Sequence, residues 1–183
     1  IMRAKSIVIE KLQSDKNGVG IDLSQQDLHR VNLADVNLEG ANLSNSILTG
    51  ASLTGANLTG ANLQKADLRG ANLTGANLTG ADLTGAYLNR ADLRQANLSR
   101  ANLTDVKLQV ALYDRQTIWL DEFNYKSSGA IGPNANLTGA YLNTANLRGV
   151  DLTGAKLIGA YLSGADLTEA NLEDAALSGA NLT

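Results

Sequence analysis

The sequence lacks most of the residues that usually carry cross-links, metals or catalysis. Its 183 residues include no cysteine and a single histidine, His29. Disulfides, thiolate nucleophiles and cysteine-ligated metals are therefore excluded, and a cluster of histidine ligands is excluded as well. We expect no metal site and no cofactor. Enzymes are the least supported class, because His29 is predicted to face solvent and no pair of carboxylates suggests acid–base chemistry.

Long apolar runs and an excess of charge of one sign are also missing. No run approaches the roughly 20 residues of a membrane-spanning helix, and the apolar patch near the N-terminus is shorter than the core of a signal peptide, about 7–15 residues. The formal net charge is −3, so there is no overall basic field to attract nucleic acid. We expect a cytoplasmic protein that contacts neither membranes nor nucleic acid.

What the sequence does contain is a repeat with a period of five. Leucine occupies every fifth position eighteen times from Leu23 to Leu108, and ten times from Leu137 to Leu182. We number each unit from this leucine, which is position 0. Position −2 is alanine in 21 of the 28 units, position −1 is Asn or Asp in 20, and position +2 is glycine in 14.

Neither a helix nor a continuous strand fits this period. Leucines five apart would be rotated by about 500° on a helix and would cover all of its sides. In a strand they would alternate between the two faces. A chain that turns a corner every five residues instead points positions 0 and −2 inward. Glycine at +2 supplies the positive φ of a tight turn, and stacked coils can pair as in a parallel sheet.

Units such as ANLTG, ADLRG and ANLSR resemble the A(D/N)LxX unit of the pentapeptide-repeat family, in the form abundant in cyanobacteria. The resemblance covers about 140 of the 183 residues. It implies an all-β fold, a right-handed, four-sided parallel β-helix with four units or twenty residues per coil. The 28 units would then make about seven coils.

The pattern divides the chain into four segments. Residues 1–20 are predicted to form an N-terminal cap, a short helix or a strand, that covers the first coil. Residues 21–108 and 135–183 form the two repeat blocks, and residues 109–134 are a loop insertion. The repeat is still running at Thr183, so two explanations stay open: the natural chain continues and is truncated here, or the last coil meets a partner. An end-to-end homodimer through the C-terminal coil is the simplest such partner.

The insertion holds four of the seven aromatic residues, Tyr113, Trp119, Phe123 and Tyr125. Its length is not a multiple of five, so we expect a loop that leaves the coils and doubles back along one face. Large aromatic residues are frequent hot spots of protein interfaces. The four side chains either attach the loop to the coils or are displayed to a partner, and the sequence leaves both possibilities open.

Residues twenty apart should stack on one face. One column at position −1 then holds Asp27, Ile47, Asp67, Tyr87 and Lys107, and the neighbouring column at +2 holds Arg30, Gly50, Gly70 and Arg90. Arg69, Arg94 and Arg100 make this region basic, whereas no base follows Lys156. An ordinary solvated surface and a charge-guided protein contact both fit this bias. Tyr141 and Tyr161 should also stack, either as ladder packing or as a binding stripe.

The favoured function is a non-catalytic scaffold or adaptor that binds an unidentified protein through a coil face and the insertion. The candidate contact residues are Tyr113, Trp119, Phe123, Tyr125, Tyr141, Tyr161, Arg90, Arg94 and Arg100. The family resemblance suggests an alternative, a DNA mimic that binds type II topoisomerases such as gyrase. Such mimics carry a markedly acidic surface, so the small net charge and the exposed arginines argue against this alternative.

Overall fold

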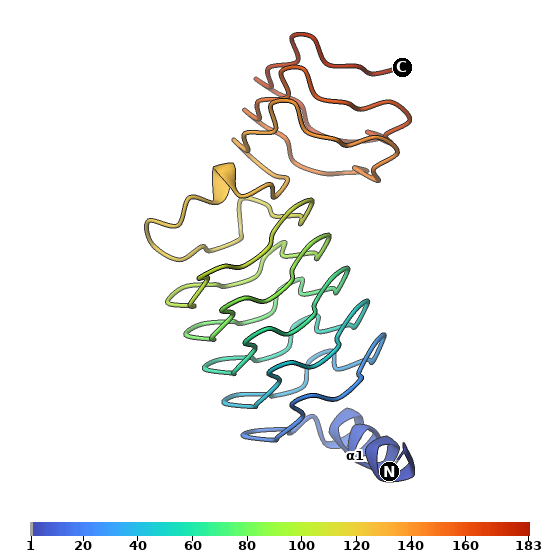
Figure 1. Ribbon diagram of the computed structural model, residues 1–183, viewed down its shortest axis with the longest axis vertical. Helices are drawn as coiled ribbons and strands as arrows, with labels where there is room; N and C mark the ends of the chain where they lie inside the picture. The colour runs from blue at the N-terminus through green and yellow to red at the C-terminus, as the bar shows by residue number, and fades with distance from the viewer. Residues whose placement is uncertain (1) are drawn as a thin grey trace.

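The protein is a tower of stacked coils with a helix at one end (Figure 1). The computed structural model describes residues 2–183, with side chains from Lys5 onward. The N-terminal segment forms a helix, α1 (Met2–Asp15), and a short 3-10 helix, η1 (Tyr125–Ser127), lies beside the middle of the tower. The C-terminus lies at the end opposite α1.

Backbone pairing joins residues twenty apart, as the column analysis predicts. Parallel pairs run from Asn17 with Asn37 up to Tyr87 with Lys107 and Asp92 with Leu112, and resume in the second block with Asn136 and Lys156. Each side of a coil contributes one paired residue, at position −1, because the chain turns directly afterwards. Four five-residue units therefore complete one coil.

Three consecutive residues on each side connect a coil to both of its neighbours. Asp82 exchanges two backbone hydrogen bonds with the coil below it, on the N-terminal side, at N···O distances of 2.8 and 2.9 Å. Its neighbours Ala81 and Leu83 exchange two with Asn102 in the coil above, at 2.8 and 2.9 Å. Position −1 thus pairs downward, and positions −2 and 0 pair upward.

The corners between sides are tight turns with a positive φ at position +2. At one corner the N–H of Ala81 donates to the C=O of Leu78 at 3.0 Å, and Gly80 has φ of +67°. The side chain of Asn77 accepts the N–H of Thr79 at 3.0 Å, a bond that favours such turns. Val110 adopts φ of +65° at the same position, which is a strained conformation for a β-branched residue.

Helix α1 caps the first coil. The coil begins at Asn17, four residues earlier than expected, since Asn17 already pairs with Asn37. Glycine occupies position 0 of this unit, and Leu12 of α1 fills the space that a leucine would take. A Cβ on Gly18 would lie only 2.7 Å from Cδ2 of Leu12, and Leu12 itself is 3% exposed.

The middle segment differs from the expected loop, because its first part continues the coils. Ala111 and Tyr113 take the inward positions −2 and 0 and are buried. Ile118 pairs with Asn97, twenty-one residues away, and Ile131 pairs with Leu112, nineteen away. Only residues 119–130, which we call the strap, leave the regular path and bulge from the tower with η1 (Figure 1). We call the region where the strap separates the two blocks the joint.

The four aromatic side chains pack against one another and the core at the joint. The ring of Tyr113 meets Trp119 edge-on at 5.5 Å and Tyr125 at 5.4 Å between centroids. Trp119 stacks on Tyr125 at 5.4 Å and on Phe123 at 5.6 Å. The Tyr113 hydroxyl donates to the C=O of Pro133 at 2.6 Å, and burial raises the pKa of this phenol. The rings therefore attach the strap to the tower.

Because the leucines of the first block are stacked and buried, a cavity in the middle of this column should lower the stability of the protein strongly. Leu78 is fully buried, so Leu78→Ala should lower the free energy of unfolding by about 2–5 kcal/mol, measured by urea denaturation. Leu182→Ala is the matched control, because Leu182 is 54% exposed and its truncation should cost clearly less. Equal losses in the two variants would contradict the buried column.

The aromatic packing predicts that Gly132 cannot be enlarged. A Cβ there would lie 2.6–2.7 Å from ring carbons of Tyr113, so Gly132→Ala should destabilise the protein by about 1–3 kcal/mol through overpacking. Tyr113→Leu removes the ring, and in that background Gly132→Ala should cost less. Thermal or urea unfolding of all four proteins measures the coupling; strictly additive losses would show that this contact is absent.

Candidate functional site

Two adjoining hollows open on the surface at the joint. One, of about 330 Å³, is lined by Arg90, Val110 and Leu112 of the lower coils and by residues 141–147 of the second block. The other, more open, lies on the first block and is lined by Thr49, Arg69, Gly70, Tyr87, Asn89, Arg90, Lys107, Gln109 and Val110. Arg90 and Val110 belong to both hollows, which we together call the joint groove.

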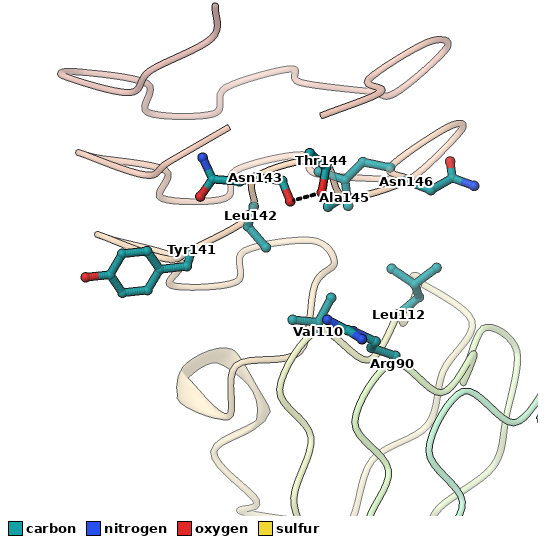
Figure 2. Close-up of a pocket in the computed structure, with 10 residues that line it drawn as sticks. Arg90, Val110, Leu112, Tyr141, Leu142, Asn143, Thr144, Ala145 and Asn146 are labelled. Carbon is teal, nitrogen blue, oxygen red and sulfur yellow. Dashed lines mark hydrogen bonds between the residues drawn. The ribbon is translucent and has the colours of Figure 1, made fainter. Parts of the chain in front are cut away.

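The two walls of the 330 Å³ hollow come from segments far apart in the sequence (Figure 2). Leu142 points from the second block toward Val110 and Arg90, and Asn146 lies above Leu112. The ring of Tyr141 points outward at the rim. The 330 Å³ hollow therefore depends on the joint, where residues 141–147 of the second block lie next to Val110 and Leu112.

The lining of the joint groove is cationic. It contains Arg69, Arg90 and Lys107 and no acidic side chain. Arg69 is bound to Asp67, with Nη2 and Oδ2 2.6 Å apart, and its hydrogen bond holds the pKa of Asp67 below the ordinary value.

The other two cations are less constrained. The ammonium group of Lys107 lies 5.6 Å from the ring centre of Tyr87 and donates to the C=O of Asp105 at 2.6 Å. Among the described residues, the guanidinium of Arg90 has neither an ion-pair partner nor a hydrogen bond. Arg90 is therefore the cation most available to a ligand.

The structure separates the three arginines predicted as contact residues. Only Arg90 lines the groove. Arg94 is held by Asp92 through two hydrogen bonds of 2.6 and 2.9 Å, so its charge is already compensated. Arg100 occupies a corner with φ of +59° and lies outside the lining of both hollows.

Tyr141 and Tyr161 stack as the column analysis predicts. Their ring centres are 4.9 Å apart with planes 9° from parallel, and their backbones pair. Tyr141 is 79% exposed and Tyr161 is 44% exposed. The two rings form an exposed aromatic surface that continues from the rim of the joint groove.

The four aromatic side chains of the middle segment pack against the protein and are not displayed to a partner. Tyr113 is only 2% exposed and is therefore not accessible to a partner. Trp119, Phe123 and Tyr125 are half-buried against the core, and none of the four lines the groove. The physical reason is that their rings fill the joint where the leucine column is interrupted.

Sequence reasoning missed the contribution of Val110 and of residues 142–147. One signal was present: Val110 stands at position +2, where glycine is the most frequent residue. A valine at a corner that requires positive φ marks a departure from the repeat. The part that residues 142–147 play in the hollow left no such signal, since the units of the second block follow the repeat.

Other chemistry finds little support in the described residues. His29 forms an exposed pair with Asp27, with Nδ1 and Oδ1 2.8 Å apart. In residues 2–183, groups of three or more His, Asp or Glu side chains suited to a metal ion do not occur. Neither helix of this part of the chain has the length and apolar character needed to cross a bilayer.

Comparison with known proteins identifies the repeat. The family model for pentapeptide repeats matches eight copies, over residues 19–45, 37–75, 76–109 and 145–183. No curated protein sequence matches the chain.

Among solved structures, a pentapeptide repeat protein from Nostoc PCC 7120 is 33% identical over 68% of this chain and 92% of its own, with a TM-score of 0.47. One from the thylakoid lumen of Arabidopsis thaliana is 32% identical over 58% and 70%, with a TM-score of 0.43. HetL of Nostoc PCC 7120, described as involved in regulating heterocyst differentiation, is 26% identical over 94% of each chain, with a TM-score of 0.36. The matches to the family model span more than half of the chain, which therefore belongs to the pentapeptide-repeat family.

Proposed function

We propose that the protein is a non-catalytic scaffold that binds another protein through the joint groove and its rim. The observation that carries this proposal is the meeting of exposed aromatic rings with an uncompensated arginine. Tyr87 and Tyr141 are 44% and 79% exposed, and Arg90 lies in the groove that both residues help to line. Tyrosine and arginine are enriched among interface hot spots.

The construction of the site supports this role. Its residues sit on corners and sides whose backbones are held by hydrogen bonds to neighbouring coils, as Arg90 N–H is held by the C=O of Gln109 at 3.1 Å. Side chains presented on a rigid backbone lose little freedom on binding. The cationic lining also weighs against the DNA-mimic alternative, which requires acidic side chains.

Affinity capture from a lysate of the source organism tests the proposal. The intact chain is compared with the variant Tyr87→Ala, Arg90→Gln, Lys107→Gln and with Ile118→Ala. Ile118 is a matched control, because it is 51% exposed and stacks on Asn97, in the column opposite that of Tyr87 in the four-sided coil. We expect a partner that is enriched by the intact chain and the control but depleted about tenfold or more by the groove variant.

Circular dichroism and thermal unfolding verify that the three proteins fold alike. A partner captured equally by all three would place the binding surface elsewhere. If no protein is enriched above background by the intact chain, the scaffold proposal loses its support.

A further inference from the structure

The coils on either side of the joint carry backbone groups without partners. In a regular coil, positions −2 and 0 pair with the coil above and position −1 pairs with the coil below. Within the described residues, the C=O of Val106 and the N–H of Leu108 lack such a partner above. The N–H and C=O of Tyr141 and of Asn146 lack one below. Two unpaired edges thus face the joint.

The path of the strap explains these free groups. Residues 119–130 bulge away where a regular coil would have covered the side that contains Val106 and Leu108. Backbone pairing resumes next to that side. There the N–H of Val110 donates to the C=O of Gly129 at 2.9 Å, and the N–H of Ile131 donates to the C=O of Ala111 at 2.7 Å. The preceding side is also unpaired, because the C=O of Ala101 and the N–H of Leu103 lack a partner above in the part of the chain that the structure describes, so the gap extends along two consecutive sides of the coil.

A short extended peptide has the groups that such an edge needs. The side around Asp82 shows the pattern, since one residue exchanges two hydrogen bonds with the coil below while its two neighbours exchange two with the coil above. A tripeptide lying along the gap would offer the same donors and acceptors. Exposed edges of this kind are templates for an added strand, and peptide recognition by strand addition uses main-chain bonds for affinity.

The side chains around the gap define the chemistry of the occupant. The lining carries three cations and no acid, and Arg90 is free to bind a carboxylate through two parallel hydrogen bonds. Val110, Leu112 and Leu142 supply an apolar wall. The hollow of about 330 Å³ falls within the usual range of ligand pockets, about 300–1,000 Å³.

We propose that the gap beside the joint groove binds an extended acidic segment of a partner protein, which pairs with the free backbone groups of Leu108 and Asn146 and reaches into the groove to place a carboxylate on Arg90. This inference rests on the proposed scaffold function and specifies its partner. Because side chains alternate along a strand, the segment carries apolar residues on either side of the acidic one, facing the wall of the groove.

The test begins with random octapeptides displayed on phage and selected on the full chain, with counter-selection on the Arg90→Gln variant. The enriched sequences are synthesised and their Kd values are measured by fluorescence polarisation. We expect peptides rich in Asp or Glu, whose Kd rises about tenfold or more with Arg90→Gln. Arg30→Gln is the matched control, because Arg30 occupies the same column and the same corner position, with φ of +56° against +61° for Arg90, and should leave the Kd unchanged.

Backbone pairing has a separate readout. Methylation of alternate amide nitrogens in the peptide should abolish binding, since it removes the donors that an added strand needs. Amide hydrogen exchange followed by NMR should show that the N–H groups of Leu108 and Asn146 exchange rapidly in the free protein and become protected when the synthetic octapeptide is added.

Four results would overturn the inference. The first is that no peptide is enriched, and the second is that the peptides bind Arg90→Gln as well as the intact chain. The third is binding that leaves the amides of Leu108 and Asn146 unprotected, and the fourth is protection of these amides that appears without peptide as the protein concentration rises. The last would assign the gap to a second copy of this chain. If a lysate partner is lost with the groove variant but peptide selection fails, the scaffold function stands and only the strand-addition mode falls.

Discussion

The fold depends on one constraint: each five-residue unit must pair its position −1 residue with residues twenty positions before and after it. Asp82 shows the arrangement, because its own backbone bonds reach down while those of its two neighbours reach up. The turn that follows satisfies further backbone groups locally, and the inward leucine is then enclosed by identical leucines above and below. Burial and backbone pairing are thereby achieved by the same geometry, so neither requires a long strand or a helix.

The joint shows what happens where this constraint is released. Between Ile118 and Ile131 the chain no longer follows the coils. Tyr113 takes the inward position of a leucine just before this stretch, and the rings of Trp119 and Tyr125 pack against it. This packing attaches the strap to the tower, and an ion pair between Arg115 and Asp151, with Nε and Oδ2 2.8 Å apart, links the middle segment to the second block. The interruption also leaves free backbone edges and a groove, which an unbroken stack of regular coils would not contain.

Function is therefore expected at the irregular part of the molecule, where new surface chemistry arises. Regular faces repeat short polar side chains that bond to their own turns, as Thr79 does with Asn77, and such groups have little left to offer a partner. The joint groove differs because the uncompensated Arg90 lies in a hollow that the largely exposed Tyr141 also lines. Membership of the pentapeptide-repeat family is compatible with this view, since the family model describes the repeat and does not cover residues 110–144.

The sequence by itself determined the five-residue period and the inward leucines, because every unit repeats the same pattern of residues. The family resemblance implied the twenty-residue coil, from which the stacking of Tyr141 on Tyr161 follows. Only the tertiary structure decided that Leu12 would fill the place left empty at Gly18, and that Tyr113 would face inward as a substitute for leucine. It also decided where the groove opens. These outcomes depend on rings and backbones brought together from distant segments, and their packing is not encoded in any local period.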